Sequence, residues 1–252
     1  MIALALALTA SAETPAPAPA PAPSADGLAP CTVLLPTFTA NGKNVTAGTM
    51  FATKVGDREV LVTAHSVFGP GGGLPAQLSP DQVVQQVTAA TAYDSLSPKV
   101  TCARTRQALK VADAAPGSGN DTSKDVAVFA VDHGEGPNRL SAVAPVPLTT
   151  LPLAAQPAKL DEDVWLLAAV NGKTGGKWAA KVVQATDTTL FIEYTDRSLD
   201  LAGTVGAAIV NAKGEVVGLN VGSGKMDDGA LIGSATPLAP LKKRITEAAA
   251  AK

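Results

Sequence analysis

The residues of this sequence that could do chemistry together are a histidine, an aspartate and a turn between two glycines. His65 follows the apolar run "LVTA", and Asp125 opens the alternating run "DVAVFAVD". A carboxylate fixed at a strand end can orient an imidazole and stabilise its protonated form, which a general base requires. Taken singly, His65 is equally an ordinary buried polar group and Asp125 an ordinary strand-end residue. His133, in "VDHGEG", has no partner pattern.

The turn in "GTVGAAIVNAKGEVVG" (203–218) lacks the atom that such a base would activate. Val205 stands between the glycines, and valine has neither the oxygen nor the sulfur that nucleophilic catalysis needs. The nearest hydroxyls along the chain are those of Thr204 and Ser66. Adjacent side chains in a tight turn point in different directions, so we expect Thr204 to point away from any substrate cleft.

Together the three stretches resemble the chymotrypsin-like, or trypsin-like, serine proteases, especially the bacterial ones. The family reads Thr-Ala-(Ala)-His, Asp-(Ile/Val)-Ala-(Val/Leu) and Gly-(Asp/Asn/Thr)-Ser-Gly-(Gly/Ala), in that order. This chain has "TAH" (63–65), "DVAV" (125–128) and "GTVGA" (203–207), followed by the family's apolar strand, turn and "GEVVG". The order His, Asp, nucleophile position is that of chymotrypsin rather than of subtilisins or α/β-hydrolases. The resemblance spans about residues 31–243, and it departs from the family at Val205.

The resemblance implies an all-β fold of two β-barrels, with His65 and Asp125 in the first barrel and the nucleophile position in the second. It implies an oxyanion hole made by the backbone N–H groups of Gly203 and Val205, and no cofactor. Its substrate-pairing strand corresponds to Leu219, Asn220 and Val221, and Leu199 falls where the family places the base of the first pocket. The ligand would be a peptide or protein.

Short strand-like runs at near-regular spacing favour a barrel or sandwich independently of this resemblance. A first series covers 31–132 and a second begins near 160, with a Pro-rich stretch (144–159) between them. We therefore expect an N-terminal barrel over 31–150 and a C-terminal barrel over 151–252. The segment 235–252 has apolar residues at helical spacing and predicts a C-terminal α-helix, with Thr236 as N-cap and Pro237 at its first position.

Composition excludes some classes of partner. The 252 residues are 46% apolar and 4% aromatic, with a net charge of −2, so a core of Val, Leu, Ile and Ala is expected. The sequence has no basic block and no alternation of aromatic and basic residues, so nucleic acid is not an expected partner. Two cysteines and two histidines, none clustered, give no metal-ligand spacing.

The N-terminus predicts export to the periplasm or the extracellular space. Residues 1–12 form an apolar run that ends in small residues, as a signal peptide does, although no Lys or Arg precedes it. The run is too short to span a bilayer, and no membrane span is expected in the mature chain. Residues 13–30 form a Pro/Ala-rich linker that should be extended. Pro30 directly before Cys31 argues against a lipid anchor on that cysteine.

Cys31 and Cys102 could form one disulfide or remain two buried thiols.

Three functions are compatible with these observations. The first is an inactive protease homologue, a pseudoprotease that keeps a peptide-binding cleft as a binding or regulatory module. The second is an active secreted serine-type endopeptidase with an unrecognised nucleophile, and the third is a structural domain without cleft function. If only the nucleophile is missing, Val205→Ser should restore measurable peptide hydrolysis.

Overall fold

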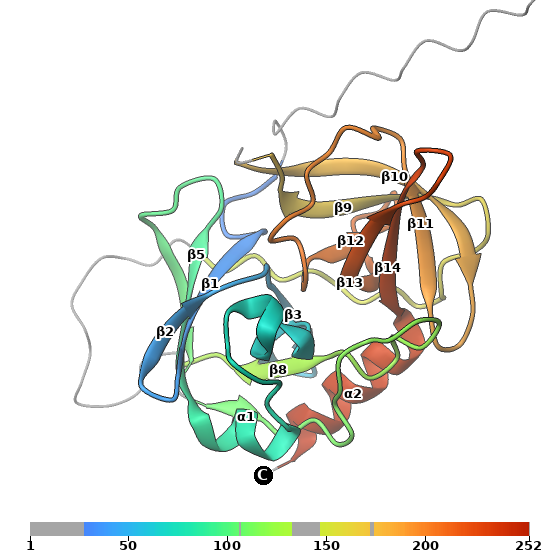
Figure 1. Ribbon diagram of the computed structural model, residues 1–252. Coiled ribbons are helices and arrows are strands. Elements are labelled where there is room, and N and C mark those ends of the chain that lie inside the picture. The colour runs from blue at the N-terminus through green and yellow to red at the C-terminus, as the bar shows by residue number, and fades with distance from the viewer. Residues whose placement is uncertain (1–27, 106, 133–146, 172–173, 252) are drawn as a thin grey trace, which may run out of the picture.

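A computed structural model of the chain describes residues 28–105, 107–132, 147–171 and 174–251. The predicted signal peptide (1–12), nearly all of the predicted linker (13–30) and His133 lie outside these residues. Within them the chain is mostly β-strand in two groups, with α2 packed below (Figure 1). The predicted all-β fold class with a C-terminal helix is therefore confirmed.

The first group of strands forms two antiparallel four-stranded sheets, in the orders β2-β1-β5-β6 and β3-β4-β8-β7. A backbone bridge between Leu34 and Met50 joins them. The Asn41–Gly42 turn links β1 to β2 with both residues at positive φ, the conformation that two-residue hairpins favour. The strands of this group are β1 (Leu34–Ala40), β2 (Lys43–Thr46), β3 (Phe51–Val55), β4 (Arg58–Thr63), β5 (Val87–Asp94), β6 (Thr101–Thr105), β7 (Ala108–Leu109) and β8 (Ala127–Ala130).

The second group of strands closes into a barrel in the order β10-β11-β14-β13-β12-β9. Every pair in it is antiparallel, and closure leaves no edge along the paired part of each strand. Its strands are β9 (Asp163–Ala169), β10 (Gly175–Ala185), β11 (Leu190–Tyr194), β12 (Ala208–Val210), β13 (Val216–Lys225) and β14 (Leu231–Pro237).

The described part of the Pro-rich connection, residues 147–159, touches both groups. Thr150 forms a parallel bridge with Ala52 of β3, and Leu153 forms one with Val216 of β13. The Leu151 amide donates to the Ala52 carbonyl (2.8 Å). The connection thus continues the β-sheet hydrogen bonding from one half to the other.

The helices differ from the sequence-based expectation. The C-terminal helix α2 (Leu238–Ala250) begins after Pro237, which occupies the N-cap position, so the predicted Thr236 cap is wrong. Thr236 lies instead near the end of β14, where it is buried. Its hydroxyl donates to the Thr122 carbonyl (2.6 Å). A second helix, α1 (Pro80–Gln86), lies within the stretch 31–132, which was expected to be a series of short strands. Short 3₁₀ turns η1 (His65–Phe68) and η2 (Pro70–Gly72) precede it.

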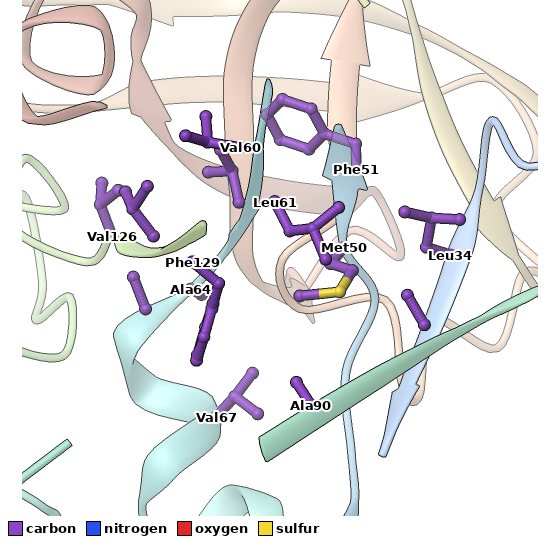
Figure 2. Close-up of a cluster of buried hydrophobic side chains, with 14 of the residues drawn as sticks. Leu34, Met50, Phe51, Val60, Leu61, Ala64, Val67, Ala90, Val126 and Phe129 are labelled. Atoms are coloured by element: carbon purple, nitrogen blue, oxygen red, sulfur yellow. The ribbon is translucent and has the colours of Figure 1, made fainter. Parts of the chain in front are cut away.

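The core of the first half gathers where its two sheets face each other. Figure 2 shows Leu34 of β1, Phe51 of β3 and Leu61 of β4 in one cluster with Met50, Ala64 and Val67. Ala64 and Val67 lie on either side of His65 in the chain. Phe38, Phe68 and Phe129 pack on one another with ring centroids 4.8–5.9 Å apart. This packing holds the end of β4, and with it the backbone of His65, against a dense apolar cluster.

The structure joins Cys31 to Cys102 in a disulfide, the pairing that the sequence left open. It ties the start of the described chain to β6, 71 residues further along. No described helix is long and apolar enough to cross a membrane.

Candidate active site

His65 is buried at the start of η1, with only 2% of its surface exposed. Its Nε2 lies 2.9 Å from the backbone carbonyl oxygen of Leu78, the residue two positions before α1. The Gln77 side-chain amide donates to the carbonyls of His65 (3.2 Å) and Leu78 (3.4 Å) and holds the two segments together. Burial lowers the pKa of His65 below its ordinary value, against the hydrogen bond to Leu78 and the negative charge of Asp125. The imidazole is therefore neutral at pH 7, with Nε2–H donating to Leu78.

Asp125 lies two residues before β8 and is 1% exposed. Its Oδ1 accepts the backbone N–H of Ser66 (2.7 Å), the residue after His65, and its Oδ2 accepts that of Gly117 (2.9 Å). Burial raises the pKa of Asp125, opposed by these N–H groups and by the proximity of His65. The carboxylate thus fixes the backbone at His65, and no hydrogen bond joins it to the imidazole ring itself.

The loop 203–206 reaches from the barrel to the first half. Gly203 and Gly206 have φ of +81° and +90°, a region that side chains disfavour. Thr49 donates its hydroxyl to the Gly203 carbonyl (2.9 Å) and its amide to the Val205 carbonyl (2.7 Å). A Cβ on Gly206 would lie 2.2 Å from the hydroxyl of Thr63. The loop therefore lies against the strand end that leads into His65.

Val205 is half-buried and packs against the core cluster of the first half. The hydroxyls that could replace a serine are buried elsewhere. Thr204 is 1% exposed, and its hydroxyl donates to the Leu201 carbonyl (2.7 Å) and accepts from the Asn220 amide (3.1 Å). The Ser66 hydroxyl oxygen is also shielded from solvent. Neither hydroxyl is presented to a substrate.

The backbone amides of Gly203 and Val205 donate no hydrogen bond within the described part of the chain. In contrast, the amides of Thr204 and Gly206 donate to the Leu201 (3.2 Å) and Asn220 (2.7 Å) carbonyls. The two unpaired donors are those that the resemblance assigns to an oxyanion hole.

The residues assigned to substrate binding are mostly internal. Leu219 and Asn220 are 0% exposed, and Leu199 is 5% exposed in the barrel core, whereas Val221 is half-buried. Asn220 uses its backbone amide and carbonyl on Ala207 and Gly206. Gly222 is also half-buried, and the exposed part of β13 is limited to 223–225.

Several residues at this site had no signal in the sequence. The carbonyl of Leu78 and the amide of Gly117 act through the backbone, which any residue type supplies. Thr49 is one of many threonines. The "SPDQ" stretch (79–82) is a recognisable helix start that would have predicted α1, although it does not reveal that Leu78 lies beside the histidine. Within the described residues no group of three His, Cys, Asp or Glu could hold a metal ion.

Comparison of the fold with solved structures returns serine proteases. The Rv3671c protease from M. tuberculosis in its active form superposes with a TM-score of 0.54 at 18% identity, covering 88% of this chain and 82% of its own. A Glu endopeptidase in complex with MPD gives 0.54 at 11% identity, covering 88% and 91%. The serine endoprotease from Yersinia pestis gives 0.52 at 15% identity, covering 86% and 63%.

This chain has the trypsin-like serine protease fold. No protein-family model and no curated protein matches its sequence. At these identities the likeness concerns the fold, so what the site does must be argued from its own residues.

Proposed function

We propose that this chain is a serine-protease-fold protein that no longer hydrolyses peptides and binds a peptide or protein segment instead. The observation that carries the proposal is Val205, which stands on a loop that otherwise keeps two positive-φ glycines and two unpaired amide donors. Without an oxygen or sulfur there, no acyl intermediate can form. The loop can still donate hydrogen bonds to a carbonyl.

The environment of His65 supports the loss of hydrolysis. A general base must lie within hydrogen-bonding distance of the proton it takes, directly or through one water. Here Nε2, the atom that would face a nucleophile, is buried and occupied by the Leu78 carbonyl at 2.9 Å. The site therefore offers neither a free base nor a nucleophile.

The support for binding is the open edge of β13. β12 pairs with β13 only as far as Leu219, whereas β14 pairs with it through Lys225. Residues 222–225 therefore have a partner strand on one side alone. Such an edge can accept an extended peptide as an added strand.

The geometry of β13 suggests which residue would pair with that peptide. Asn220 directs its amide and carbonyl toward residues 206–207, and the pairing with β14 shifts by one residue between Asn220 and Gly222. Hydrogen-bonding groups alternate between the two edges of a strand, and the shift moves that alternation by one position. The backbone amide and carbonyl of Gly222 then face β14, and the backbone amide of Ser223 faces the open edge.

A pair of substitutions tests this assignment. Ser223→Pro removes the backbone N–H, and Ser223→Ala keeps it while removing the hydroxyl. Against an extended-peptide library, we expect Ser223→Ala to bind as the unmodified protein does and Ser223→Pro to lose binding at least tenfold. Equal binding by all three proteins would overturn the role of this edge, and no binding by any would favour the structural-domain alternative.

A fluorophosphonate probe tests the loss of hydrolysis. We expect no labelling of the purified protein. Labelling that His65→Ala abolishes would instead support an active endopeptidase with a different nucleophile.

We also propose that the chain is exported, on the strength of its apolar N-terminus. N-terminal sequencing of protein from the native host should find Glu13 first. An intact Met1 on cytosolic protein would contradict export.

A further inference from the structure

A cavity of about 450 Å³ lies away from the candidate site, between β3, the connection 150–153 and helix α2. Its apolar wall comes from Val55, Leu151 and Leu153, and the hydroxyl-bearing residues Thr150 and Thr246 lie beside it. Such a wall suits an extended chain that brings few hydrogen-bond donors of its own.

The charges around this cavity have one sign. Lys54 and Lys242 line it, and no acidic residue does. Lys54 forms an ion pair with Glu59 (3.4 Å). Lys242 is exposed on α2 and has no ion-pair partner within the described residues. The cavity therefore presents one uncompensated cation, and an anionic group would complement it.

The described part of the chain begins close to this cavity. The Thr149 hydroxyl donates to the Pro30 carbonyl at 2.8 Å, and Thr149 directly precedes Thr150 of the lining. Residues 13–27, "ETPAPAPAPAPSADG", immediately precede this anchored start. Fifteen residues in the polyproline conformation span about 45 Å. The segment is long enough to enter the cavity from its attachment point.

The composition of the segment matches the cavity. Its five prolines lack an amide N–H, and its alanines are apolar. It contains Glu13 and Asp26 and no Lys or Arg, which complements Lys242 and Lys54. From these observations we propose that residues 13–27 dock intramolecularly in this cavity, with a carboxylate of the segment paired to Lys242. The docking is independent of whether the site around Val205 binds a peptide.

Zero-length carbodiimide cross-linking of the full chain tests the docking, because it joins a lysine to a carboxylate only when the two are in contact. After reduction and tryptic digestion, we expect the N-terminal peptide that ends at Lys43 to be cross-linked to Lys242 or Lys54. The yield per chain should not change across a hundredfold range of protein concentration.

Charge-reversal variants provide the matched control. Lys242→Glu should reduce cross-linking of the segment to Lys54 at least fivefold, since the docked carboxylate would be repelled. Lys243→Glu, at the neighbouring helix position and outside the lining, should leave that cross-link unchanged. Circular dichroism checks that both variants fold.

Two outcomes would overturn the proposal. One is the absence of any cross-link between residues 13–27 and either lysine. The other is a cross-link that appears only between two chains and grows with concentration, which would assign the cavity to a second copy.

Discussion

At the scale of single residues, the site has two separate obstacles to peptide hydrolysis. Val205 offers no atom to activate, and the Nε2 of His65 already donates to the Leu78 carbonyl. The second obstacle is made by backbone and burial, so a change at Val205 does not remove it. Replacing the nucleophile alone would leave the Nε2 of His65 buried, protonated and hydrogen-bonded to Leu78.

We therefore predict that Val205→Ser does not restore hydrolysis, although the sequence alone suggested that it would if only the nucleophile were missing. Serine is smaller than valine and should fit without overpacking. Turnover of a casein or fluorogenic peptide panel should equal that of Val205→Ser/His65→Ala. A rate more than tenfold above this double variant would show that His65 can leave Leu78 and act as a base.

The buried His65 also gives a prediction about pH. Its pKa is lowered in the folded chain, so below about pH 6.5, the ordinary value for histidine, the unfolded chain binds more protons than the folded one. The contribution of His65 to the free energy of unfolding should thus fall as pH drops from about 6.5 toward the lowered pKa. Above about pH 6.5 this contribution should not change with pH. Asp125, whose pKa is raised, contributes a slope of opposite sign at lower pH.

His65→Gln removes this titration while keeping a side-chain amide that can donate to Leu78. Urea unfolding at several values between pH 5 and 7.5 should show a smaller loss of stability for this variant than for the unmodified chain. Both proteins keep Asp125 and His133, so the difference isolates His65. Parallel curves would mean that His65 titrates normally.

At the scale of elements, the site depends on three segments that meet around β4 and β8. The loop 112–124 leads into Asp125, α1 follows Leu78, and the turn 203–206 comes from the barrel. The loop is fixed from two sides. Thr122 donates to the Ala235 carbonyl (2.6 Å) in the barrel, and Arg244 of α2 donates to the carbonyls of Ser123 (2.8 Å) and Ala112 (2.5 Å).

We predict that Arg244→Met lowers the free energy of unfolding by about 1.5–3 kcal/mol, the range for hydrogen bonds to a charged group. Methionine keeps most of the side-chain length and the helix propensity. Lys243→Met, at an exposed neighbouring position, should change stability by less than about 0.5 kcal/mol. Equal effects of the two substitutions in urea unfolding would mean that Arg244 contributes no more than a surface residue.

The strands were predictable from the sequence because alternation and turn residues are local signals. Asn41–Gly42 marked one hairpin, and Gly56–Asp57 marked the turn between β3 and β4. Helix α1 was missed because its apolar residues also suit a strand, while the deciding signal, Ser79 capping Gln82, is polar. The Thr236 cap was wrongly predicted for the opposite reason, because a local preference was overridden by the buried hydrogen bond to Thr122.

The candidate site was less predictable than the strands. The motifs indicate His65, Asp125 and the 203–206 turn, but side-chain directions depend on distant backbone. Nothing near His65 in the sequence reveals that Leu78, 13 residues away, provides a carbonyl for its ring. The burial of Leu219 and Asn220 follows from closure of the barrel, which the pattern of a single strand does not determine.

At the scale of the whole molecule, the chain runs from one half to the other and back. The N-terminal segment belongs to the first half through β1, while the C-terminal α2 follows the last barrel strand and packs on β3, β4 and β8 (Figure 1). Arg58 of β4 donates to the Ala249 carbonyl near the end of α2 (2.6 Å). The two halves are therefore held together by α2 as well as by the 150–153 connection, which favours unfolding as one unit.

The Cys31–Cys102 disulfide should make a large contribution to the stability of that unit. The two cysteines are 71 positions apart in the sequence. The loop that the disulfide closes contains β1 to β5, the two 3₁₀ turns and α1. Closing a loop of this length reduces the entropy of the unfolded chain by an amount worth about 4 kcal/mol. We predict that Cys31→Ser/Cys102→Ser lowers the free energy of unfolding by about 2–4 kcal/mol in urea unfolding, because the unfolded chain regains this entropy. Reductant should destabilise the unmodified chain toward the same value and leave the double variant unaffected. If reductant changes neither protein, the cysteines are not bonded in solution.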